Sequence, residues 1–148
     1  MTELANGLET VKIIDSSYDL EGREIVCYPN HIFTFKVSIH RLFMKPRIFY
    51  STITVDMVKG NAALSNMFPE HKTIEISEQS LVPTLIKEET AIEEAKKVII
   101  KWARHKFRVY KAPEIEIAKQ EKLYKVFFYA EVDNEPMIVD SIKGVEMK

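Results

Sequence analysis

Residues 25–42 are dense in β-branched and aromatic residues, and beyond Pro29-Asn30 apolar and polar side chains alternate along this stretch. Alternate positions of a strand face opposite sides of a sheet, so this pattern predicts a half-buried strand. Pro29 lacks a backbone N–H, so it is expected at a strand start, a bulge or a sheet edge. The apolar face of the strand is predicted to consist of Phe33, Phe35, Val37 and Ile39.

The chain is then predicted to turn and run back as a second strand over residues 48–55, with residues 43–47 as the tip of the hairpin. Both faces of the returning segment carry apolar side chains, which favours a central place in a sheet. Shorter alternating runs predict a strand at residues 9–15 and an edge strand at residues 73–76. Residues 61–70 show no regular period and are predicted to cross the surface.

Residues 88–107 carry apolar side chains at spacings of three and four, which predicts an amphipathic helix. Its apolar stripe is expected to contain Ile92, Ala95, Ile99, Trp102 or Ala103, and Phe107. Glutamates crowd the first turns and lysines and arginines the last turns. The helix dipole favours this order of charges.

After the helix, alternation predicts strands at residues 114–118 and 123–132 and a return at residues 137–140. Polar residues 120–122 and 133–136 are interpreted as the turns between them. This part of the chain is therefore predicted to be a helix followed by a three-stranded meander.

A short motif ends both predicted hairpins. Residues 55–60 read Val-Asp-Met-Val-Lys-Gly, and residues 139–144 read Val-Asp-Ser-Ile-Lys-Gly. An Asp side chain can accept hydrogen bonds from amides that follow it, and Gly adopts positive φ readily. Asp56 and Asp140 are therefore interpreted as turn residues rather than as catalytic acids.

Together these patterns predict an α+β fold. Its antiparallel sheet or sheets would come from two related β-hairpin units, with one main amphipathic helix at about residues 88–107. Residues 1–148 are expected to form a single compact domain of two related halves, about 1–76 and 77–148.

The order of a helix, three strands and a final Val-Asp-x-x-x-Gly turn resembles the PepSY-like family of small modules. The resemblance covers residues 88–146, and residues 25–62 only in their hairpin. It implies a cystatin-like helix packed on an antiparallel sheet. It also implies a binding or inhibitory module, often linked to proteases or the cell envelope, and it supplies no catalytic residues.

Composition narrows the classes of function. The chain has 148 residues, of which 46% are hydrophobic and 29% charged, and its formal net charge is −1. These values are typical of a globular domain, and the total charge does not favour a nucleic-acid or anionic-membrane partner. The sequence has a single cysteine, and it shows neither a secretory signal pattern nor an apolar run long enough to span a membrane. We therefore expect a cytoplasmic protein.

The residues that commonly carry catalysis or metals form no familiar motif. Histidines 31, 40, 71 and 105 show no pairwise ligand spacing, and the glycines do not form a phosphate loop. Cys27 lies in an apolar run, so a buried unreactive thiol is favoured over a nucleophile activated by His31. No cofactor or metal is predicted, and a non-enzymatic role is favoured over catalysis.

Two basic segments are the best candidates for a binding site. Residues 96–111 and the hairpin tip at residues 41–47 combine lysines and arginines with aromatic side chains and contain no acidic residue. Such segments can bind single-stranded nucleic acid or another anionic ligand. The alternative is that Trp102 and Phe107 belong to the core while the charges face solvent. The candidate binding residues are Arg41, Lys45, Arg47, Lys101, Arg104 and Arg108.

Three functional hypotheses follow. The first is a non-catalytic module that binds a protein partner, or a second copy of the chain through the edge strand at residues 73–76. The second is a protein that binds nucleic acid or an anionic ligand through the two basic segments. The third is an enzyme whose site is assembled from Cys27, a histidine and the Asp turns.

Overall fold

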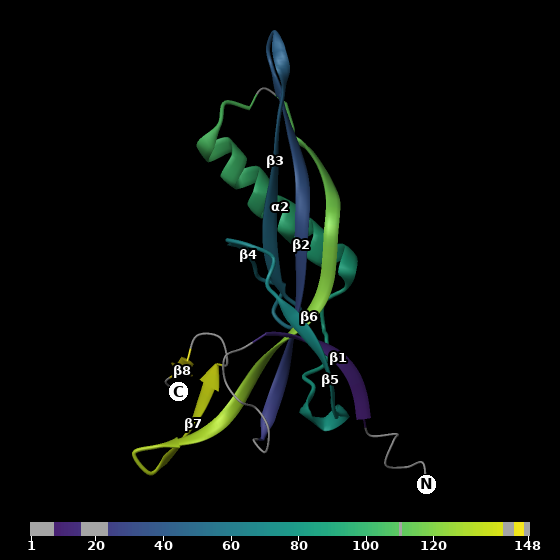
Figure 1. Cartoon of the computed structure of the whole chain (residues 1–148). Helices are drawn as coiled ribbons and strands as arrows, with labels where there is room; N and C mark the ends of the chain where they lie inside the picture. The colour runs from purple at the N-terminus through teal and green to yellow at the C-terminus, as the bar shows by residue number, and fades with distance from the viewer. Residues whose placement is uncertain (1–7, 16–23, 110, 141–143, 147–148) are drawn as a thin grey trace. The chain divides into compact units, whose positions relative to one another are not determined.

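The computed structural model describes residues 8–15, 24–109, 111–140 and 144–146, which form an α+β fold with mostly antiparallel strands, as predicted (Figure 1). A short 3-10 helix (Glu78–Ser80) connects β5 to the segment that leads to α2. The other elements are β1 (Leu8–Ile14), β2 (Ile25–Arg41), β3 (Met44–Asp56), β4 (Ala62–Ser65), β5 (His71–Ser77), α2 (Glu88–Lys106), β6 (Glu114–Val132), β7 (Glu135–Asp140) and β8 (Gly144–Glu146).

The chain divides into two compact units that differ from the two predicted sequence halves. Unit 1 consists of residues 1–30, 69–83 and 122–148, and unit 2 consists of residues 31–68 and 84–121. Each unit combines segments from both halves because β2 and β6 are long strands that contribute residues to both units. Local patterns do not reveal which distant segments pair.

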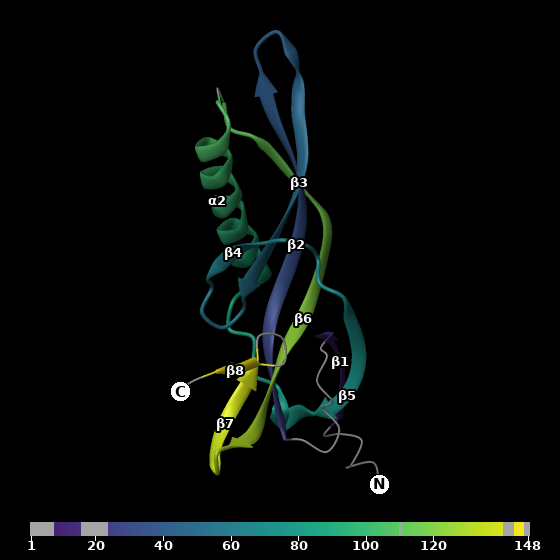
Figure 2. The same ribbon diagram turned by 60° about the vertical axis from the view of Figure 1, so that its left-hand side comes forward.

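Unit 2 is a sheet in the order β4-β3-β2-β6 with α2 packed on one face (Figure 2). The predicted apolar face of β2 is confirmed, since Phe33, Phe35, Val37 and Ile39 are all buried. Opposite them, α2 buries three alanines and Ile99, so small side chains on the helix face large rings on the sheet. The buried side chains of α2 are Ala91, Ala95, Ile99 and Ala103.

Unit 1 is built on β5, β1 and β6. β5 pairs with β1 in antiparallel register from Leu8↔Ser77 to Ile14↔His71, and β1 meets β6 in parallel at Ile13↔Tyr124. β5 ends the strand order, as predicted for an edge strand. β7 returns along β6 after a turn at Asp133 and Asn134, whose positive φ values of 54° and 67° are tolerated well by these two residue types.

Two local predictions are wrong. The turn predicted at residues 120–122 does not exist, because β6 is one continuous strand of 19 residues from Glu114 to Val132. Residues 120–122 are polar, as turn residues often are, but they continue the strand. They lie where β6 passes from unit 2 to unit 1. Residues 61–70 are not wholly irregular either, because β4 pairs with β3 from Thr52↔Ser65 to Val55↔Ala62.

The first copy of the repeated motif forms the turn that the sequence predicts. Asp56 Oδ1 accepts hydrogen bonds from the backbone N–H groups of Val58 and Lys59, at 2.8 and 2.9 Å. Gly60 has a φ of +88°, where a side chain would strain the backbone, and its N–H donates to the carbonyl oxygen of Asp56.

In the second copy of the motif, the aspartate is more deeply buried than in the first. Asp140 is fully buried at the end of β7, and its Oδ2 lies 2.7 Å from Nζ of Lys125. Residues 141–143 of this copy, including Lys143, lie outside the described residues. The relation between the two hairpins therefore remains a prediction.

Replacing Asp56 with alanine is expected to lower the free energy of unfolding by about 1 kcal/mol, because two turn amides lose their acceptor. Replacement with asparagine keeps an oxygen at the same place and should cost less than half as much. Urea unfolding followed by circular dichroism measures both variants. Equal losses for the two variants would contradict the proposed role of Oδ1.

Cys27 is predicted from sequence to be buried, and this is confirmed. Its side chain packs with Ile13 and Val126 in the core of unit 1, and burial raises the pKa of its thiol from 9.0 to about 11. A higher pKa in the folded state means that the folded protein holds this proton more tightly. Between pH 9.0 and about 11, Cys27 therefore lowers the free energy of unfolding as the pH rises.

At pH 8, iodoacetamide is expected to alkylate Cys27 in the folded protein at least about 100-fold more slowly than in urea, because two pKa units remove about 99% of the thiolate. Mass spectrometry of timed samples measures the rate. Equal rates in the folded and unfolded protein would contradict the burial of Cys27.

Candidate nucleic-acid interface

The β2–β3 hairpin ends in a two-residue turn at Leu42 and Phe43 and continues beyond the end of α2 (Figure 2). The tip was predicted at residues 43–47, but Met44–Arg47 already belong to β3. Phe43 has a φ of 59° and is fully exposed, at 101% of its reference area. Arg41 Nε donates a hydrogen bond to the Lys45 carbonyl oxygen at 2.9 Å, which ties the two strands together next to the turn.

Three aromatic rings pack against one another where the hairpin meets the end of α2. Phe49 lies 5.1 Å from Trp102 and 5.7 Å from Phe107, and Trp102 lies 5.7 Å from Phe107, all between ring centroids. Both helix aromatics are only partly exposed, and both pack against the core of unit 2. Trp102 and Phe107 thus pack against the core, as the alternative predicts, although neither is fully buried. Tyr110, the third aromatic residue of segment 96–111, lies outside the described residues.

Three of the six candidate residues meet in one hollow of about 250 Å³, here called the tip hollow. Arg41 comes from β2, Arg47 from β3, and Arg108 from the segment after α2. The Arg47 guanidinium carbon lies 4.7 Å from the centre of the Phe107 ring, so the core aromatic orients this cation. The tip hollow is lined by Ile39, Arg41, Leu42, Met44, Arg47, Phe107 and Arg108.

Two other candidates, Lys101 and Arg104, lie on one nearly flat face of α2, together with Lys97, Ile100 and His105. Both side chains are exposed near the C-terminal end of the helix. That end carries the negative pole of the helix dipole, which stabilises the basic residues of its last turn. Lys45, the sixth candidate, is exposed on β3.

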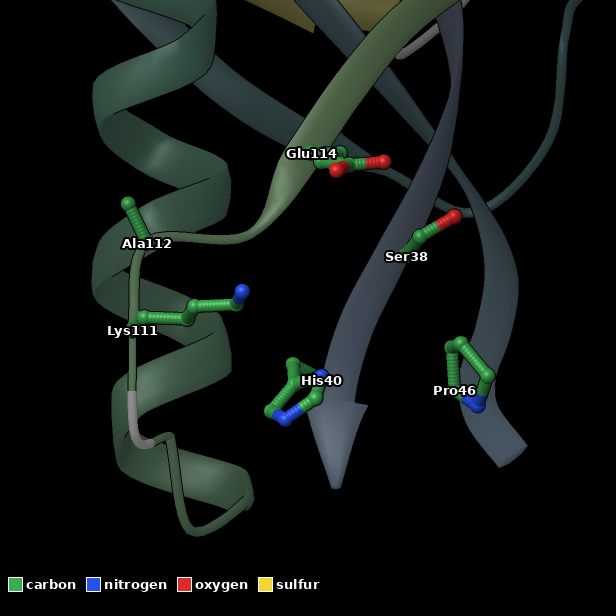
Figure 3. A pocket seen from close by; sticks show the side chains of 6 residues that line it. All are labelled: Ser38, His40, Pro46, Lys111, Ala112 and Glu114. Carbon is green, nitrogen blue, oxygen red and sulfur yellow. The ribbon is translucent and has the colours of Figure 1, made fainter. Parts of the chain in front are cut away.

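A second hollow of about 90 Å³ is lined by residues of the hairpin and of the segment after α2 (Figure 3). Lys111 extends toward the strand that carries His40, while Glu114 at the start of β6 adds one negative charge. Side chains alternate along a strand, so Ser38 and His40 point to the opposite face of β2 from Ile39 and Arg41. Basic side chains therefore flank both faces of the hairpin.

The two units carry opposite net charges that nearly cancel in the net charge of the whole chain. Unit 2 contains 14 Lys and Arg against 8 Asp and Glu, a formal net charge of +6. Unit 1 contains 7 Lys and Arg against 14 Asp and Glu, a formal net charge of −7. Unit 2 by itself therefore can attract an anionic partner despite the near-zero charge of the whole chain, because long-range attraction depends on where the charges lie.

Sequence reasoning found the cations but not all of their surroundings. Lys111 and Glu114 line one hollow with His40 although they lie far from it in the chain, and no local pattern predicts this arrangement. Over the described ranges, no group of three or more His, Cys, Asp or Glu side chains is arranged to hold a metal ion. Within the same ranges, no helix is both long and apolar enough to cross a membrane.

Comparison with known proteins found no matching family model, curated protein or solved structure. The resemblance to PepSY-like modules therefore remains a prediction.

Proposed function

We propose that unit 2 binds nucleic acid through the tip hollow and the basic end of α2. The observation that carries the proposal is the convergence of Arg41, Arg47 and Arg108, from three separate segments, on one hollow. Like charges placed together repel one another, and a polyanion removes this repulsion when it binds. Guanidinium groups also bind phosphate oxygens through paired hydrogen bonds, which ammonium groups cannot do in the same geometry.

The remaining candidates extend this surface. Lys101 and Arg104 lie on the part of α2 that precedes Phe107, and Lys106 Nζ lies 5.6 Å from the centre of the Trp102 ring. Residues 96–111 and 41–47 themselves contain no acidic residue, although Glu94 pairs with Lys97 at 3.0 Å and Glu114 lines a hollow with Lys111. The surface therefore suits the backbone of a nucleic acid better than a ligand with a single charge.

Fluorescence anisotropy with labelled DNA and RNA oligonucleotides tests the proposal across a range of salt concentrations. Each phosphate contact changes the slope of log K against log salt by about −0.7 for single strands and −0.9 for duplex DNA, so five cations predict a slope of about −3.5 to −4.5. A dissociation constant below about 100 µM is expected at low salt. Absence of binding at about 50 mM salt would contradict the proposal.

A second candidate function is a non-catalytic module that binds a protein partner. It is supported by apolar side chains that are exposed on the hairpin, including Leu42, Phe43, Met44, Ile48 and Tyr50. Self-association is one form of this function, since β5 ends the strand order of the described sheet. Light scattering at several protein concentrations tests for a dimer, and a mass that stays monomeric throughout would contradict self-association.

A further inference from the structure

The hairpin tip has a form that the stability of unit 2 does not explain. Phe43 is fully exposed and adopts a φ of 59°, in a region of backbone space that non-glycine residues seldom occupy. Leu42 and Met44 beside it are 47% and 61% exposed. A bulky ring held in solvent at a strained position gains nothing from folding, so its placement suggests a contact with a ligand.

The residues that flank the tip are cationic and lie on both faces of the hairpin. Arg41 and Arg47 line the tip hollow on one face. On the other face the cation is Lys111, which lines the second hollow together with Glu114 and His40. A ribbon with cations on both faces matches a groove whose two walls are both phosphate backbones. A flat surface such as a lipid headgroup layer would meet only one face of the ribbon.

Single-stranded nucleic acid is a poorer match for the tip itself. Proteins that bind single strands stack successive bases on several exposed rings, but Phe49, Trp102 and Phe107 are packed against one another. The hairpin exposes two rings, Phe43 at 101% and Tyr50 at 63%, but Tyr50 lies further along β3 and Phe43 alone stands at the point of the two-stranded ribbon. A single apolar side chain in such a position can act as a wedge between two base pairs.

We propose that the β2–β3 hairpin enters the minor groove of duplex DNA, where Phe43 inserts between base pairs and kinks the duplex. Arg41 and Arg47 contact the phosphates of one strand, and Lys111 contacts those of the other. This proposal rests on the proposed binding of nucleic acid by unit 2. It adds that the nucleic acid is duplex DNA and that Phe43 is the side chain that bends it. The kink allows the basic end of α2 to reach further phosphates.

The test uses the full chain and a DNA duplex of about 30 base pairs that carries a donor dye at one end and an acceptor dye at the other. Wild-type protein is expected to increase energy transfer between the dyes, because minor-groove wedges bend DNA by about 20–90°. Phe43→Ala should abolish this increase while its affinity stays within about tenfold of wild type and its salt slope is unchanged. Phe43→Trp keeps a large ring and should retain the increase.

Phe43→Ala is a suitable variant because the ring is fully exposed, so its removal leaves the core of unit 2 intact. The insertion of Phe43 is contradicted if wild type binds the duplex without a change in energy transfer, or if Phe43→Ala bends the duplex equally. Either result leaves the proposed binding of nucleic acid intact. If neither duplex nor single-stranded oligonucleotides bind at low salt, the proposed function itself fails. Sedimentation with phosphatidylcholine–phosphatidylserine vesicles that requires Phe43, without any change in the DNA, would assign the tip to a membrane surface instead.

Discussion

Replacing Arg41, Arg47 and Arg108 together by alanine is expected to weaken the binding of a single-stranded oligonucleotide about 100-fold at about 0.1 M salt. All three arginines line the tip hollow, so each is expected to contact phosphate. Each lost contact changes the slope of log K against log salt by about 0.7, so the slope should become less steep by about 2. Anisotropy titrations at several salt concentrations measure both quantities.

A matched variant separates local contacts from total charge. Replacing Lys12, Lys72 and Lys122 by alanine changes the net charge by the same amount, but these residues belong to unit 1. The only ion pair described for Lys72 is with Asp15, at 3.8 Å and with both side chains 47% exposed, so its loss should have little effect on stability. If the unit 1 variant weakens binding as much as the arginine variant does, binding depends on overall charge and the assignment of the tip hollow is wrong.

Replacing Phe35 with alanine is expected to lower the free energy of unfolding by about 3–5 kcal/mol. Phe35 is fully buried, its ring centroid lies 5.4 Å from that of Phe33, and its cluster includes the alanines of α2. Those alanines are too small to fill the cavity that the substitution leaves. Urea unfolding followed by the fluorescence of Trp102, the single tryptophan of the chain, measures the loss in unit 2.

Phe43→Ala removes the same side-chain atoms at a fully exposed position and is the natural control for Phe35→Ala. Its free energy of unfolding should stay within about 0.5 kcal/mol of wild type. A loss below about 1 kcal/mol for Phe35→Ala would mean that α2 does not pack tightly over β2. A large loss for Phe43→Ala would mean that the tip folds back onto the protein.

The cations of the candidate site were predictable because their types and local spacing are visible in the chain. The hollow that unites Arg41, Arg47 and Arg108 was not, since it depends on how the end of α2 meets the hairpin. The aromatic residues of the two basic segments also differ in exposure. Trp102 and Phe107 pack with Phe49, a partner more than fifty positions earlier in the sequence, and Phe43 is left as the ring fully exposed to solvent.

The sequence by itself determined the local elements whose pattern repeats within a few residues. It placed the buried face of β2, the ends of α2 to within one residue, and the turn at Asp56, because periodicity and Asp-to-amide hydrogen bonding act over short distances. Only the tertiary structure decided that residues 120–122 continue a strand and that β4 joins the sheet. The tertiary structure also decided that most basic residues lie in unit 2 and most acidic residues in unit 1. Each unit is assembled from segments that are distant in the sequence, and local sequence patterns do not predict which distant segments pair.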